Sequence, residues 1–209
     1  MDISLIQAPV ASYHASFFAG KPEPVRGSGN RHLLYPGATA LVSFNNPDIA
    51  RWHDVIPIDG EGVFLFKQSA VEQMQSIGVS GIEFHPVVIE RILSSKLNKV
   101  PRPTYYWGRI TGTLDGTLFL NGNPVPVDPK TGVITKETSI ELRMSLPAPG
   151  SLTFKPNWES WSGCDFFYLW PYPTRKNYCG ERVSKLAAEN RWTNIFLGST
   201  VMPDGLMKA

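Results

Sequence analysis

A pattern of short apolar segments around an amphipathic stretch occurs twice in this chain of 209 residues. In the first copy, residues 62–66 (Gly-Val-Phe-Leu-Phe) precede the amphipathic stretch and residues 81–84 (Gly-Ile-Glu-Phe) follow it. In the second copy, the flanking segments are residues 165–170 (Asp-Phe-Phe-Tyr-Leu-Trp) and 194–197 (Asn-Ile-Phe-Leu). Short continuous apolar runs are typical of buried strands, so each copy predicts a strand–helix–strand unit.

The first amphipathic stretch carries signals for both ends of a helix. Residues 69–72 (Ser-Ala-Val-Glu) have the form of a capping box, in which the serine and glutamate side chains bond the first amides of a helix. Val71, Met74 and Ile77 are spaced to share one apolar face. Gly78 is suited to end this helix in a left-handed conformation.

The second amphipathic stretch has a similar periodicity. Cys179, Val183, Leu186 and Ala187 fall on one helical face, and Asn190 is expected to end the helix. Matching the apolar positions of the two copies requires one inserted residue in the second.

Between the two copies the chain favours β-hairpins. Asp115-Gly116 and Asn121-Gly122 are dipeptides that readily adopt the positive φ angles of two-residue hairpin turns. Residues 139–146 alternate polar and apolar side chains, as a half-buried strand does.

These elements together predict an α+β fold, in which two strand–helix–strand units pack with a β-hairpin-rich middle section. A hydrophobic content of 42% is sufficient for a sizeable core in a chain of this length. Residues 1–209 are expected to form a single domain, or two intimately packed halves of about residues 1–100 and 101–209.

Charge and hydropathy restrict the possible partners and the compartment. A formal net charge of +2 is too small for the basic surface that nucleic-acid-binding proteins present. The first residues lack the pattern of a signal peptide, and no apolar run approaches the length of a membrane span. We therefore expect a cytoplasmic protein with no membrane partner. Cys164 and Cys179 are expected to be free thiols, with a disulfide between them left open.

No set of residues with catalytic or metal-binding spacing is found in the sequence. The histidines, which are His14, His32, His53 and His85, do not occur in pairings typical of a metal site. Cys179 lies near an expected helix start, where a thiol can be activated, but its spacing favours a core position. We therefore expect no enzymatic activity, no metal and no cofactor. An unrecognised hydrolase would need a deep pocket with a strongly perturbed titratable group.

Aromatic residues are densest between positions 158 and 172. Trp158 and Trp161 stand in a polar, turn-rich context and are expected to be exposed, whereas Trp192 is expected in the core. Tryptophan offers a large, rigid contact area and is enriched in binding hot spots. The segment therefore indicates a surface that binds a protein or, by stacking, a carbohydrate or a nucleic acid.

Several short motifs in the chain resemble a family of bacterial immunity proteins. The motifs are residues 161–167 (Trp-Ser-Gly-Cys-Asp-Phe-Phe), 181–186 (Glu-Arg-Val-Ser-Lys-Leu) and 192–197 (Trp-Thr-Asn-Ile-Phe-Leu). Residues 64–88 and 106–110 are similar to the middle section of the same family. The family belongs to polymorphic toxin systems, and its relatives include paralogues named for a double Cys-x-x-Cys-Gly motif. Both of these cysteine motifs are absent here, so zinc is not carried over from those relatives.

The resemblance implies an antitoxin that binds one cognate toxin, which a contact-dependent or type VI secretion system delivers during interbacterial competition. Toxins of nuclease type often accompany such proteins, and steric occlusion in the producer's cytoplasm is the expected mechanism. The alternative is a carbohydrate- or nucleic-acid-binding module that uses exposed tryptophans. A homo-oligomer is left open. The expected partner-binding residues are Trp158, Glu159, Trp161, Asp165, Tyr172 and Arg175. Trp161 and Asp165 belong to the shared motif, so a structural role is the alternative for these two.

Overall fold

The computed structural model describes residues 3–7, 14–17, 40–44, 49–58, 63–128, 152–170, 177–199 and 207–208. Its helices are α1 (Gln68–Ser76), the 3-10 helix η2 (Leu97–Lys99) and α3 (Glu181–Glu189). Its strands are β1 (Ile3–Gln7), β2 (His14–Phe17), β3 (Ala40–Phe44), β4 (Val55–Ile58), β5 (Val63–Lys67), β6 (Ile82–Ile92), β7 (Tyr105–Ile110), β8 (Thr113–Leu120), β9 (Asn123–Pro124), β10 (Leu152–Pro156), β11 (Phe166–Trp170), β12 (Tyr178–Gly180), β13 (Phe196–Ser199) and β14 (Met207–Lys208). Neither α-helix in this part of the chain has the length and apolar content needed to cross a membrane.

The strands form two mixed sheets, which confirms the predicted α+β class. One sheet has the order β13-β1-β12-β11-β8-β10-β14, with β9 paired to β8, and the other has the order β2-β3-β6-β7-β5-β4. Most pairs are antiparallel, whereas β8 with β11 and β3 with β6 are parallel. The predicted strand at residues 139–146 lies outside the described residues.

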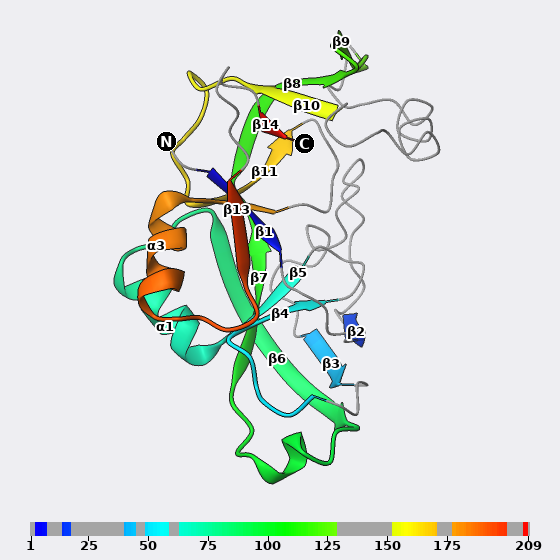
Figure 1. Cartoon of the computed structure of the whole chain (residues 1–209), viewed down its shortest axis with the longest axis vertical. Helices are drawn as coiled ribbons and strands as arrows, with labels where there is room; N and C mark the ends of the chain where they lie inside the picture. Colours follow the sequence, from blue (N-terminus) through cyan, green and yellow to red (C-terminus); the bar gives the residue numbers. More distant parts are fainter. Residues whose placement is uncertain are drawn as a thin grey trace.

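The two helices lie side by side against the strands of both sheets (Figure 1). One hydrophobic cluster joins them, with Val71 and Met74 from α1, Val183 from α3, Phe66 from β5 and Phe166 from β11. The Phe66 and Phe166 rings meet edge to face at 6.1 Å, so the cluster connects the two sheets. Each sheet also has a second cluster on its other face. Strands β5 and β11 are therefore buried on both faces, which explains their continuous apolar runs.

The internal repeat is larger than the sequence pattern indicates. Each copy is a hairpin followed at once by a helix: β4–β5–α1 in the first and β11–β12–α3 in the second. Val55 pairs with Phe66 in the first hairpin and Phe166 pairs with Cys179 in the second, and each helix begins two residues later. The strand that leads directly into the second helix is therefore β12, not β11.

The predicted insertion between the two copies is wrong. Both helices have nine residues, and their third and seventh positions are buried in each: Ala70 and Met74 in α1, Val183 and Ala187 in α3. The predicted match of Val71 with Val183 is displaced by one position, because apolar spacing alone leaves the register of a short helix ambiguous.

A polar clasp connects the first copy to the second at Asp165. The backbone N–H and the hydroxyl of Ser80 both donate to Oδ2 of Asp165, at 2.9 and 3.0 Å. The N–H of Asp165 donates in return to the Ser80 hydroxyl at 3.1 Å. The N–H of Phe166 donates to the Ser80 carbonyl at 3.0 Å, so the loop after α1 is fixed to the start of β11. We call this set the Asp165 clasp.

A second clasp has the same pattern of donors and acceptors. The N–H and the hydroxyl of Thr193 donate to Oδ2 of Asp54 at 2.9 and 2.8 Å, and the Asp54 N–H donates to the Thr193 hydroxyl at 3.0 Å. The N–H of Val55 donates to the Thr193 carbonyl at 3.3 Å. Ser80 and Thr193 each lie four residues after the last residue of their helix. Each copy thus supplies the aspartate for one clasp and the hydroxyl residue for the other.

The C-terminal end of α1 follows the prediction. Gly78 has φ +63°, and its N–H donates to the Gln75 carbonyl while the N–H of Val79 donates to the Met74 carbonyl, both at 3.0 Å. These are the two hydrogen bonds of a Schellman motif. Ile77, predicted on the buried face, is 38% exposed because the helix ends before its side chain can turn towards the core.

The N-terminal end of α1 does not follow the prediction, because no capping box forms there. The helix begins at Gln68, directly after strand β5, and Ser69 already lies within the first turn. The Gln68 N–H, which would otherwise lack a partner, donates to the Thr104 carbonyl at 2.9 Å. The Glu72 carboxylate instead accepts a hydrogen bond from the Gln68 side chain at 2.7 Å. Tertiary contacts replace the local cap.

Of the two predicted hairpin turns, one forms. Asn121 and Gly122 have φ +52° and +80° between β8 and β9, as a two-residue turn requires. The predicted turn at Asp115-Gly116 is wrong, because both residues lie inside β8. At Gly116 an added Cβ would collide with the Lys155 carbonyl oxygen of the neighbouring strand, so this glycine permits close strand packing.

The close approach of β11 to Gly81 predicts that two alanine substitutions differ in their effect on stability. Gly81 and Gly122 have nearly equal φ angles, +78° and +80°, so Gly81→Ala and Gly122→Ala impose similar backbone strain. A Cβ at Gly81 would also overlap the Phe166 carbonyl oxygen, whereas nothing lies within 4 Å of one at Gly122. In urea unfolding, Gly81→Ala is expected to lower the free energy of unfolding by about 2 kcal/mol more than Gly122→Ala. Equal losses would contradict the close approach of β11 to Gly81.

Candidate functional site

The predicted contact residues Trp158 and Trp161 lie on the loop between β10 and β11. Trp158 is 40% exposed, and its ring meets that of Trp161 edge to face at 5.5 Å. The half-buried Trp161 in turn contacts Phe167 at 5.6 Å, and Phe167 stacks on Tyr178 at 5.8 Å. A series of aromatic rings thus leads from the core to the surface, so that Trp158 is exposed on a rigid support.

The remaining predicted residues have different positions. Glu159 is exposed beside Trp158, and the loop is turned by a hydrogen bond from the Trp161 N–H to the Trp158 carbonyl at 3.4 Å. Asp165 is only 4% exposed and belongs to the clasp. Tyr172 and Arg175 lie outside the described residues.

Asp165 also forms an ion pair with α3. The Arg182 guanidinium donates to its Oδ2 at 3.1 Å and also to the Ile77 carbonyl at the end of α1. With the Ser80 hydrogen bonds, one carboxylate oxygen is held by the loop after α1 and by α3. Asp165 is therefore engaged within the chain, which is the structural role that the sequence left as an alternative.

The two cysteines are both buried and free. Cys179 lies in β12 ahead of the helix, and its sulfur is 3.9 Å from the Ser184 hydroxyl. Burial raises the pKa of the Cys179 thiol to about 12, which makes it a core residue and not an activated nucleophile. Within the described residues, no three His, Cys, Asp or Glu side chains gather as metal ligands would.

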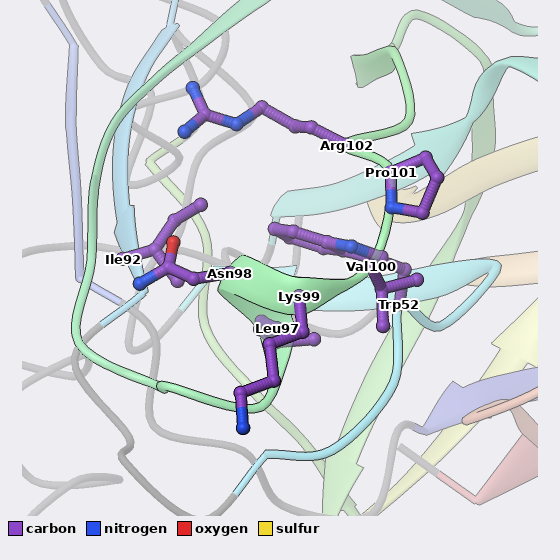
Figure 2. Close-up of a pocket in the computed structure, with 8 residues that line it drawn as sticks. All are labelled: Trp52, Ile92, Leu97, Asn98, Lys99, Val100, Pro101 and Arg102. Carbon is purple, nitrogen blue, oxygen red and sulfur yellow. The ribbon is translucent and has the colours of Figure 1, made fainter.

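A concave surface that the sequence did not indicate lies around Trp52. Two adjoining hollows of about 390 and 400 Å³ share Trp52, Val100 and Pro101 in their walls. Figure 2 shows the Trp52 ring edge-on beneath the extended Arg102 side chain, with Ile92 on one side and Pro101 on the other. We call this surface the Trp52 hollow.

Cations surround the Trp52 hollow. Lys99 and Arg102 line one part, and Arg51 and Lys67 line the other. None of the described lining residues is acidic; Lys67 pairs with the nearby Asp54 at 3.5 Å. The signal in the sequence was weak: residues 91–103 contain four cations, at positions 91, 96, 99 and 102, and no acid. These cations are separated by uncharged residues, so the sequence shows no continuous basic run. Arg51 is distant in the sequence and joins the hollow only through the fold.

The chain matches no family model, and no curated protein matches its sequence. The geometry and the sequence motifs therefore carry the functional argument.

The Asp165 clasp predicts that two nearby carboxylates differ greatly in their contribution to stability. Asp165→Ala removes the acceptor for two Ser80 donors and the partner of Arg182, and is expected to lower the free energy of unfolding by about 3 kcal/mol. Glu159→Ala, at an exposed carboxylate six positions earlier, is the matched control and is expected to change it by less than about 0.5 kcal/mol. Equal values from urea unfolding would contradict the clasp.

Burial of Cys179 predicts resistance to thiol reagents. In the folded protein at pH 8, a reagent such as DTNB is expected to label neither cysteine faster than the chain unfolds. Rapid labelling of Cys179 in the folded protein would contradict its core position.

Because the pKa of Cys179 is about 12 in the fold against an ordinary value of 9.0, the neutral thiol contributes stability below pH 9 that is lost as pH rises towards 12. The fall in the free energy of unfolding between pH 8 and 10 should therefore be smaller in Cys179→Ala.

Proposed function

We propose that this protein is an immunity protein that binds a cognate bacterial toxin and blocks it by stoichiometric occlusion. The observation that carries the proposal is the 40% exposed Trp158 beside Glu159, with its ring packed on that of Trp161. Its support by Trp161 means that little conformational entropy is lost on binding. Exposed tryptophans of this kind are frequent hot spots in protein interfaces.

The placement of the motif residues supports the resemblance to immunity proteins. Trp161 and Asp165 come from one motif and Arg182 from the next. In the fold, Trp161 contacts Phe167 of β11, and Asp165, directly before β11, pairs with Arg182. The motifs are thus parts of one structural unit that presents the Trp158 loop. Their shared role is to hold the loop, while the exposed residues of the loop are those that contact the toxin.

The geometry gives less support to a carbohydrate- or nucleic-acid-binding module. Such a module uses parallel exposed rings on which sugars or bases stack. The planes of Trp158 and Trp161 differ by 61°, and Trp161 is half-buried. A single exposed ring with an adjacent carboxylate suits a protein surface better.

The proposed partner is a secreted toxin, for example one of nuclease type, that is neutralised in the producer's cytoplasm. Nuclease inhibitors often match a basic active site with acidic groups. Here the clustered charges around the Trp52 hollow are basic. We therefore propose that the protein obstructs the toxin's substrate path sterically, without imitating nucleic acid.

The test is co-expression with the product of the neighbouring toxin gene. We expect growth rescue, and co-purification of a complex that contains both proteins in equal numbers. Trp158→Ala is expected to weaken binding by about 30-fold, which corresponds to about 2 kcal/mol. Val127→Ala is the control, because Val127 is similarly exposed at 42% and lies outside the Trp158 loop.

Two results would contradict this proposal. Growth rescue with no physical complex would indicate enzymatic detoxification. A complex whose affinity is equally insensitive to Trp158→Ala and Val127→Ala would place the contact surface elsewhere.

A further inference from the structure

Trp52, in the wall of the hollow, carries a buried hydrogen-bond donor that has no acceptor among the residues the structure describes. Trp52 is 8% exposed and packs edge to face against Phe44 at 5.2 Å. Its Nε1–H is buried, and no acceptor for it is found among the described residues. An N–H group that lacks an acceptor keeps an uncompensated positive end, so an anion bound beside Trp52 would be favoured.

The charges around this donor specify the kind of acceptor. Arg51, Lys99 and Arg102 make no ion pair within the described part of the chain. The Arg102 guanidinium donates from one nitrogen to the Ile89 carbonyl at 3.2 Å, which fixes its position above the hollow and leaves its other donors for a ligand. One neutral donor among three cations is suited to an anion.

The walls of the hollow specify what accompanies the anion. Ile92, Leu97, Val100 and Pro101 provide aliphatic surface, and Val100 is 43% exposed at the rim. A volume of about 390 Å³ is in the range of small-ligand sites, and large enough for a few side chains. Because Trp52 is so deeply buried, its ring face is not available for stacking on a base. This distinguishes the hollow from the aromatic platforms that bind single-stranded nucleic acid.

We propose that the Trp52 hollow binds an acidic peptide segment of a protein partner, with a carboxylate between Lys99 and Arg102 at the rim, beside Trp52, and an aliphatic side chain against the wall. Charge complementarity carries this choice of occupant, since the rim is basic and the wall apolar. In Figure 1 the green turn of η2, whose residues line the Trp52 hollow, and the yellow segment after β10, which is the Trp158 loop, lie towards opposite ends of the molecule. The proposal is therefore separate from the neutralising role of the Trp158 loop.

The experiment is a titration of the full-length ¹⁵N-labelled protein, followed at the indole N–H signal of Trp52. That signal is assigned through its contacts with Phe44, so Trp52 need not be replaced. The probes are the peptide acetyl-Leu-Glu-Leu-Glu-amide, its uncharged analogue acetyl-Leu-Gln-Leu-Gln-amide, and a short oligothymidylate. We expect the acidic peptide to shift the Trp52 signal downfield, and the uncharged peptide to leave it in place.

Rim variants test the contribution of the cations. The double variant Lys99→Gln, Arg102→Gln is expected to weaken binding of the acidic peptide by about tenfold. Lys155→Gln, at an exposed lysine in the other sheet, is the matched control and should leave the affinity unchanged.

Three results would overturn the proposal. The first is that the Trp52 signal fails to respond to the acidic peptide, and the second is that it responds equally to the uncharged peptide. The third is that the oligothymidylate binds more tightly than the acidic peptide, which would identify a nucleic-acid site. None of these results bears on growth rescue through the Trp158 loop, so the two proposals fail independently.

Discussion

One buried carboxylate connects the two copies of the fold and helix α3. Asp165 accepts hydrogen bonds from the backbone and side chain of Ser80 and from Arg182, so the loop after α1, the start of β11 and helix α3 meet at a single buried group. A charge in this position is tolerated because its hydrogen-bonding capacity is used by specific donors. Around it, Gly81 and Gly112 permit the Phe166 carbonyl to approach more closely than any side chain would allow. The sheets are therefore joined by polar contacts of fixed geometry as well as by the apolar core.

The two clasps are reciprocal, and this has consequences for how the copies depend on each other. Asp54 of the first copy is held by Thr193 of the second, while Asp165 of the second is held by Ser80 of the first. The shared cluster under α1 and α3 takes its members from both copies, and both exchanges hold the copies together around it. Hydrophobic burial supplies a driving force without direction, and the paired carboxylates fix which loop meets which strand.

The same frame presents two surfaces of different chemistry. The Trp158 loop is carried by the segment that ends at the Asp165 clasp, and its rings continue into the core. Trp52 lies two residues before Asp54, so the Trp52 hollow is next to the other clasp. Cations surround this hollow. Each candidate binding surface is thus adjacent to one clasp. A position that is rigidly held in this way can keep an aromatic side chain oriented for binding at small entropic cost.

The sequence by itself determined the class of fold and most of the local elements. Continuous apolar runs indicated β5 and β11, helical spacing indicated α1 and α3, and the Asn121-Gly122 turn followed from its φ preference, because these features depend on neighbours along the chain. It also indicated the exposure of Trp158 from the polar residues around it. Only the tertiary structure decided the roles of Asp115-Gly116, of Asp165 and of the cations at Trp52. Gly116 serves close packing against Lys155, Asp165 finds a partner 85 positions away, and Arg51 joins Lys99 and Arg102 through folding. Such contacts are set by which distant segments meet, and no local pattern of side chains contains that information.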